Sequence, residues 1–140
     1  QESFLMFTTS LLSGDVCTHA QLFMWGIDDQ SVTDFVVQAK IKNWGGTVDS
    51  SDWMTGADLA AANTVANLDT SGFVVDAYNA FADGPDASLE DQVTSSNLLW
   101  LCLSSSRQSG AGNAPTGNEY VDLTSADGTN KPKLAVTMYG

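Results

Sequence analysis

The chain has 140 residues, 43% of them hydrophobic, so it is long enough to form one domain with a sizeable buried core. It carries 17 acidic residues against 5 Lys and Arg, a formal net charge of −12, which argues against binding to nucleic acid or to an anionic membrane. No apolar run is long enough to cross a bilayer, so membrane insertion is not expected. Position 1 is not Met and no leader-like segment follows it, so either a leader was removed or the chain is a fragment.

Short apolar or alternating runs, separated by turn residues, fill the first part of the chain. Ser3–Thr9 is an apolar run of strand length, and Val16–Gly26 alternates so that both of its faces carry large side chains. Asp34–Lys42 is the clearest half-buried strand, because its apolar residues fall at alternate positions. Asn43–Gly56 is a long irregular segment rich in Gly, Asp and Ser, and segments of this kind often carry function.

The middle of the chain mixes helical and strand signals. Ala57–Asn63 predicts one or two helical turns, and Gly72–Val75 predicts a short strand. Asp76–Asp83 predicts a further helical turn with its first residue as the N-cap. Asn97–Ser104 is a continuous apolar run, which predicts a central strand covered on both faces and places Trp100 in the core.

Two alternating runs close the chain on either side of a turn-rich segment, ADGTNK. They are Glu119–Thr124 and Pro132–Tyr139. The second predicts a strand that begins at proline, because a proline inside a strand would have no N–H for the ladder. Several short strands with turns between them, little helix and no internal repeat predict an all-β fold, an antiparallel β-sandwich that forms a single domain over residues 1–140.

Residues that carry most enzyme chemistry are scarce. His19 is the only histidine and lies within a predicted strand, where a surface or hydrogen-bonded role is expected instead of catalysis. Paired carboxylates for sugar hydrolysis are the remaining catalytic option, but a chain with 17 acidic residues always offers such pairs. We therefore expect no enzymatic activity. Cys17 and Cys102 either pair with each other or remain buried free thiols.

Aromatic residues in the loops predict one kind of binding site. Aromatic faces stack on sugar rings, and Trp44, Trp53 and Tyr78 are the candidates for such glycan contact. The alternative is that these side chains anchor loops or fill the core.

Acidic loops predict a second kind of site. Calcium needs several oxygen ligands, and Asp28, Asp29 and Asp34 are the candidates for a calcium site. The same ligand type recurs in a second acidic group: Asp83, Asp86, Glu90 and Asp91. The alternative is a set of solvated turns, because no EF-hand-like loop is present. No cofactor other than calcium is expected.

Five segments, taken in order, resemble the disaggregatase-related carbohydrate-binding modules called DNRLRE domains, and the similar jelly-roll modules of phage structural proteins. They are FLMF, VCTHAQLFMW, the Trp-bearing NWGGTVDSSDW with GFVVDAYNAF, and the closing KPKLAVTMY, which is similar to the family's Arg/Lys-Pro-x-Leu-x-Val-x-Tyr strand. The resemblance covers nearly the whole chain and implies a sandwich of the jelly-roll type with one or two helical turns.

The chain departs from that family in two places. Ser125–Thr129 stands where the family carries a Ser-Arg-Glu-like segment, which puts the family's ligand site in doubt. The one or two strands that precede the FLMF-like run in the family have no counterpart here. The resemblance therefore implies a sandwich that lacks its first strands, with the missing edge supplied by another chain through strand addition.

Two functions are compatible with these observations. The first is a non-enzymatic display module on the outside of a larger assembly, as a virion decoration or fibre or a cell-surface adhesin, which acts through protein partners or self-association and through glycan contact. The second is a carbohydrate-binding module of a secreted polysaccharide-degrading protein. The first ranks ahead, because a partner chain explains an incomplete sandwich. Both predict an extracellular or virion-surface location.

Overall fold

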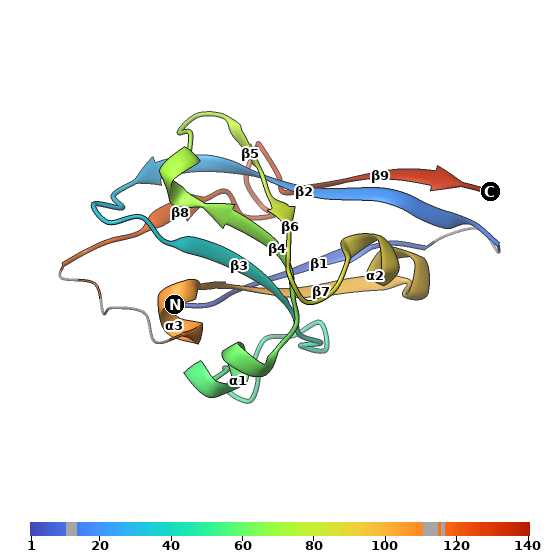
Figure 1. Cartoon of the computed structure of the whole chain (residues 1–140), viewed down its shortest axis with the longest axis horizontal. Helices are drawn as coiled ribbons and strands as arrows, with labels where there is room; N and C mark the ends of the chain where they lie inside the picture. The colour runs from blue at the N-terminus through green and yellow to red at the C-terminus, as the bar shows by residue number, and fades with distance from the viewer. Residues whose placement is uncertain (11–13, 111–114, 116) are drawn as a thin grey trace.

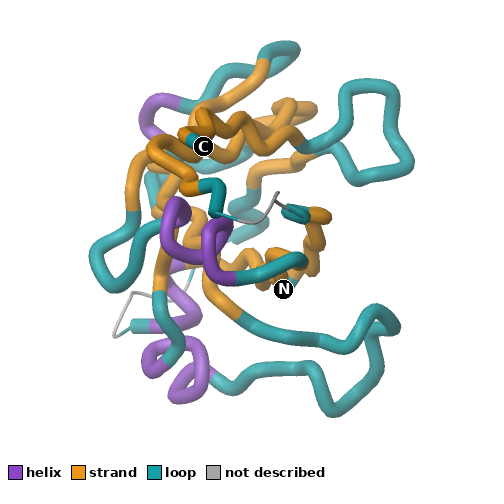
Figure 2. Tube along the Cα trace, turned by 90° about the vertical axis from the view of Figure 1, so that its right-hand side faces the viewer, coloured by secondary structure: helices purple, strands orange, loops and turns teal. Residues whose placement is uncertain are grey.

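The chain folds into two antiparallel β-sheets packed face to face. The computed structural model describes residues 1–10, 14–110, 115 and 117–140. Within these residues, nine strands make up the two layers, which Figure 1 shows from the side. In Figure 2 the C-terminal end lies with the upper layer and the N-terminal end with the lower layer. The predicted all-β sandwich is confirmed.

The strands, in chain order, are β1 (Ser3–Thr8), β2 (Val16–Asp29), β3 (Val36–Ile41), β4 (Thr64–Asp69), β5 (Tyr78–Ala80), β6 (Ala82–Asp83), β7 (Leu98–Ser105), β8 (Val121–Leu123) and β9 (Lys133–Tyr139). The helices are α1 (Gly56–Ala61), α2 (Leu89–Ser95) and α3 (Ser106–Ser109), with a 3-10 turn, η1, at Thr70–Gly72.

The larger sheet has the strand order β1-β7-β3-β4-β6. β7 is covered on both faces, as its continuous apolar sequence predicts. Leu99 and Leu101 point into the core between the sheets, whereas Cys102 points the other way and packs with Met54 and Leu59 under α1. The outer face of this sheet therefore has a small apolar cluster of its own.

The smaller sheet is organised around β2. Phe23 opposes Ala80 of β5 and Lys133 of β9, so these two strands lie on opposite edges of β2. β8 and β9 follow each other along the same edge, because Leu123 opposes Gly26 and Lys133 opposes Phe23. They form one interrupted strand, with the segment 124–132 looped out between its two parts.

The main core lies between the two sheets. It gathers apolar side chains from both sheets and from α2: Cys17, Ala20, Leu22, Met24, Val37, Ala39, Val65, Ala66, Leu68, Phe81, Leu89, Val93, Leu99, Leu101 and Leu103. Phe81, 2% exposed, connects β5 to β6 at the point where the chain passes from the smaller sheet to the larger. Its backbone N–H donates to the Leu22 carbonyl at 2.9 Å. This crossing closes one side of the sandwich.

α2 covers the edge of β2 that lies opposite β9. Its Glu90 carboxylate accepts a hydrogen bond from the Ala20 N–H at 2.9 Å, and its Thr94 hydroxyl accepts one from the Cys17 N–H at 3.0 Å. The Ser88 side chain caps the helix by accepting from the Asp91 N–H at 3.0 Å. Side chains of this helix thus take the place of a neighbouring strand.

Three local predictions are wrong. The segment 76–83 contains β5 and β6 instead of a helical turn, and Asp76 has a φ of 58° and donates its N–H to the Gly26 carbonyl. Gly72–Val75 is not a strand, and it packs closely on Gly26, where a Cβ would lie 2.5 Å from the Val74 carbonyl oxygen. Trp100 lies partly buried on the outer face of its sheet instead of in the core. In the first two cases a tertiary contact with β2 overrides local propensity.

Candidate functional site

The two sides of the sandwich are built differently. On one side, the passage from β5 to β6 joins the edges of the two sheets. On the other side, β1 is the edge of the larger sheet and the β8–β9 pair is the edge of the smaller sheet. No segment among the described residues adds a strand to either of these edges. We call this side, from β1 to β8 and β9, the open side.

The free edge of β1 presents backbone groups at alternate residues. The Thr9 N–H donates to the Asn97 carbonyl at 2.7 Å, which extends the β1–β7 register by one residue. In an antiparallel ladder, residues alternate between facing the partner strand and facing away from it. Phe4, Met6 and Thr8 therefore direct their N–H and C=O groups to the open side.

The free edge of β9 can be assigned in the same way. Ala20 directs its N–H, and Leu22 its carbonyl, to the edge of β2 that lies away from β9. Their partners on β9 are Val136 and Leu134. By the same alternation, Leu134, Val136 and Met138 direct their backbone groups to the open side.

β9 also lacks the features that normally block pairing at a sheet edge. From Leu134 to Tyr139 it contains no charged residue, no proline and no glycine. Its side chains are conspicuously exposed, with Val136 at 43% and Tyr139 at 73%. An exposed apolar edge without such features is a template for a further strand.

A cleft of about 1060 Å³ lies between the two sheets at the open side. The segment 124–127, from the loop between β8 and β9, forms part of its wall. Its apolar lining comes from both sheets: Leu5, Met24, Val37, Leu103, Val121 and Leu123. The open side thus combines edges that have no neighbouring strand with a cleft of mixed apolar and polar lining beside β1 and β8.

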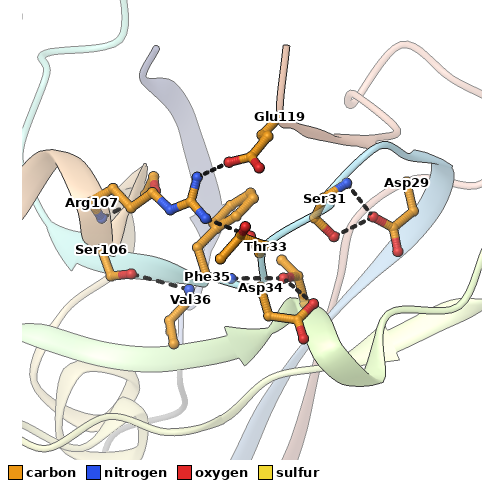
Figure 3. Close-up of polar contacts among 11 residues, drawn as sticks. Asp29, Ser31, Thr33, Asp34, Phe35, Val36, Ser106, Arg107 and Glu119 are labelled. Atoms are coloured by element: carbon orange, nitrogen blue, oxygen red, sulfur yellow. Dashed lines mark hydrogen bonds and ion pairs between the residues drawn. The ribbon is translucent and has the colours of Figure 1, made fainter. Parts of the chain in front are cut away.

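An ion pair, Arg107 with Glu119, lies at the mouth of this cleft (Figure 3). The two side chains are 15% and 5% exposed. The guanidinium of Arg107 also donates to the Thr33 carbonyl and lies 5.3 Å from the centroid of the Phe35 ring. The hydrogen bond from Arg107 holds the pKa of the Glu119 carboxyl below its usual range. Sequence reasoning missed this pair, and the only signal was that Arg107 is the single arginine of the chain.

Trp44 and Trp53, two of the predicted glycan-stacking residues, belong to the segment 43–56, which packs on the outer face of the larger sheet through Trp44 and Met54. The Trp44 ring meets Trp100 edge to face, with 4.9 Å between centroids and 90° between planes. Its Nε1 donates to the Leu5 carbonyl at 3.2 Å, so this side chain anchors the segment to β1. Trp53 is exposed.

Tyr78, the third predicted residue, lies on the smaller sheet instead. Its ring meets Trp25 on β2 edge to face at 5.2 Å, and the Lys133 Nζ lies 4.0 Å from its centroid. Its hydroxyl donates to the Lys131 carbonyl at 3.1 Å. The three predicted residues therefore do not form one surface. Sequence reasoning missed Trp25 and Lys133 as companions of Tyr78, because strand pairing brings them together.

Two of the three candidate calcium ligands, Asp28 and Asp29, accept hydrogen bonds within their own loop, whereas Asp34 accepts one from Thr70 in η1. The Asp28 carboxylate accepts from the Asp29 N–H, and the Asp29 carboxylate accepts from the N–H and hydroxyl of Ser31 (Figure 3). Asp34 accepts from the Thr70 hydroxyl at 3.4 Å. Within residues 1–10, 14–110, 115 and 117–140, no three His, Cys, Asp or Glu side chains gather as metal ligands would. The calcium site stays a prediction.

The cysteines and the histidine also have defined places. Cys17 lies in the core between the sheets and Cys102 on the outer face of the larger sheet, so both are buried and free. Burial raises the pKa of both thiols, that of Cys102 to about 12. His19 is exposed, with its Nδ1 3.7 Å from the Glu90 carboxylate that already accepts from Ala20.

None of the helices in the described part of the chain has the length and apolar character needed to cross a bilayer. Comparison with protein-family models, with curated proteins and with solved structures gives no match to this chain. The open side is therefore the site that the geometry of the chain itself supports best.

Proposed function

We propose that this domain is a non-enzymatic display module that attaches to the outside of a larger assembly through a β-strand of another chain, bound at the open side. The observation that carries the proposal is the pair of edges without a neighbouring strand, β1 on one sheet and β8 with β9 on the other, together with a cleft between the β1 and β8 parts of these edges. A virion or a cell surface is the setting that this role implies.

Strand addition would use both properties of the open side. A bound strand gives the free N–H and C=O groups of an edge their hydrogen-bond partners, and alternate side chains of that strand fill a pocket beside it. Both sheets contribute apolar side chains to the cleft, beside polar ones, so it offers such a pocket next to β1 and β8. The net charge of −12 keeps the isolated module soluble until it meets its partner.

Photo-crosslinking in the cells that make the protein tests this proposal. The crosslinking residue p-benzoylphenylalanine is placed at Met6 on β1, at Val136 on β9, and at the exposed Ala60 on α1 as a control. We expect covalent adducts with another polypeptide from one or both of the first two positions and none from the third. Adducts that form equally at all three positions, or at none, would contradict attachment through the open side.

Glycan contact is the second candidate function, and the observation that favours it is the cluster of Tyr78, Trp25 and Lys133 on the smaller sheet. Aromatic area beside a polar group suits a sugar ring. If glycans bind there, Tyr78→Ala lowers retention on a polysaccharide column. Trp53→Ala tests in the same way whether the loop on the larger sheet contributes to retention. Unchanged retention of both variants, with intact circular dichroism spectra, would reject glycan binding through these residues.

A further inference from the structure

We infer that the strand bound at the open side is β9 of a second copy of this chain, so that two copies form a two-fold dimer by antiparallel pairing of their β9 strands. This inference rests on the proposed function, since it names the partner at the same side of the sandwich. β9 runs beside β2 to the C-terminal end in Figure 1.

The alternation of β9 fixes the register. Leu134, Val136 and Met138 direct their backbone groups outward, and a two-fold axis at Val136 places this residue opposite its own copy. Leu134 then lies opposite Met138 of the second copy, and about six backbone hydrogen bonds form between the two strands. A register shifted by one pair toward the start of β9 would use Pro132, which has no N–H to donate.

The side chains of β9 suit this register. Val136 is 43% exposed on an edge, and the pairing covers it with apolar neighbours from the other copy. Tyr139, 73% exposed, comes to lie opposite Lys133 of the second copy, so the pairing also covers part of this exposed ring.

The charges at the two ends of β9 favour an antiparallel arrangement. Lys131 and Lys133 lie at its start, whereas Asp15 lies beside its end, with Oδ1 2.6 Å from the position a Cβ would take at Gly140. Antiparallel pairing brings the basic end of each copy next to the acidic end of the other, and keeps the two lysine ends about 20 Å apart. β1 offers no such complementarity, because Ser3–Thr8 contains no charged residue.

Sedimentation velocity on the full chain, over a range of concentrations, tests the dimer. Val136→Pro removes one N–H from the free edge of β9. It leaves the ladder with β2 intact, because the backbone N–H and C=O of Val136 point away from β2. Met6→Pro is the matched control, since it makes the same change at the free edge of β1. We expect wild type and Met6→Pro to dimerise alike, and Val136→Pro to raise the dissociation constant on the order of tenfold or more.

A second variant keeps the test independent of proline's effect on folding. Opposed residues of a hydrogen-bonded antiparallel pair lie about 5.5 Å apart between Cα atoms, which suits a disulfide. Val136→Cys should therefore form an oxidised dimer, whereas Thr137→Cys should not, because in this register Thr137 lies opposite Ala135 of the second copy. The native cysteines are buried and do not compete.

Several results would overturn the inference. They are a monomeric wild type at every concentration, a dimer abolished by Met6→Pro and kept by Val136→Pro, or equal oxidation of the two cysteine variants. A monomeric wild type that still gives photo-adducts with a different polypeptide at Val136 rejects the second copy and retains the proposed function. The absence of any adduct rejects the proposed function itself.

Discussion

The interrupted strand of the smaller sheet predicts the outcome of a defined deletion. From Leu123 to Lys133 the chain advances ten residues, while the opposing residues on β2 advance only three, from Gly26 to Phe23. The excess is seven residues. Removing residues 125–131, which joins Thr124 to Pro132, should therefore fuse β8 and β9 into one strand without changing either register. Pro132 would sit at a position that faces away from β2, where no N–H is needed.

The energetic change should be small, because two terms of opposite sign nearly cancel. Shortening the connection from nine residues to two lowers the entropy cost of closing the loop by about 1.3 kcal/mol. The deletion also removes the exposed hydrogen bond from the Tyr78 hydroxyl to the Lys131 carbonyl, worth about 0.5–1 kcal/mol. We expect a free energy of unfolding within about 1 kcal/mol of wild type.

Urea denaturation followed by tryptophan fluorescence measures this difference, and hydrogen exchange of the β9 amides reports whether the strand still pairs with β2. The matched control deletes six residues, 126–131, and leaves one residue too many. That residue forces either a bulge, which disrupts the ladder locally, or a one-residue slip of the strand. The slip would turn Leu134, Val136 and Met138 to the wrong face. Equal stability of the two deletions, or loss of β9 protection in the seven-residue deletion, would refute the register argument.

Three further predictions concern the frame that holds the open side in place. Phe81→Ala should cost about 3–5 kcal/mol in unfolding free energy, because this 2% exposed ring fills the core at the closed side; a loss below about 1 kcal/mol in urea titration would contradict that role. Gly84→Ala should lower the free energy of unfolding by about 1–3 kcal/mol, since its Cβ would lie 2.3 Å from the Thr64 carbonyl oxygen. Gly72→Ala is the control: its Cβ would meet open space, so its free energy of unfolding should stay within about 0.5 kcal/mol of wild type in the same assay. Burial lowers the pKa of Lys40 in the folded state, so between that lowered pKa and about 10.4 the unfolded chain binds more protons than the folded one. The free energy of unfolding of the wild type should therefore rise with pH across this window, relative to that of Lys40→Met. Parallel pH profiles of the two proteins would contradict this last prediction.

The elements that sequence patterns predicted well are those with strong periodicity. β2, β3, β7 and β9 follow alternating or continuous apolar runs, and their pairing confirms the sandwich. α2 was missed although its signal was present, because Ser88 supplies an N-cap and Leu89 and Val93 are four residues apart on one helical face.

Other elements depend on contacts that no local pattern contains. Gly72–Val75 was predicted as a strand and Asp76–Asp83 as a helical turn, but Gly26 allows this part of the chain to approach β2 so closely that a Cβ at Gly26 would collide with Val74. β4 carries Asn67 within its apolar alternation, and it becomes a strand through its pairing with β3. These segments take their structure from β2 and β3, which lie far away in the sequence.

The candidate site was the least predictable part. The resemblance suggested an incomplete sandwich, because no strands precede the FLMF-like run, but which edges remain free depends on the order of strands in both sheets. The pairing of Arg107 with Glu119, and that of Trp25 with Tyr78, likewise join elements that only the sheet topology brings together. The acidic residues suggested a calcium site, and the structure adds that the Asp28 and Asp29 carboxylates accept hydrogen bonds within their own loop.

The width of the smaller sheet explains why the site for a further strand should be β9. Beside the first residues of β2, this sheet contains only β2 and β9, since β5 and β8 pair with its later part. A two-stranded ribbon is marginal by itself, and α2 supports only one of its edges, through Glu90 and Thr94. The larger sheet has five strands and needs no such support at β1. A strand added to β9 would bring this end of the smaller sheet to three strands or more. Self-association and the local stability of β9 should therefore rise together, and slower exchange of the β9 amides at higher protein concentration would be the direct sign of that coupling.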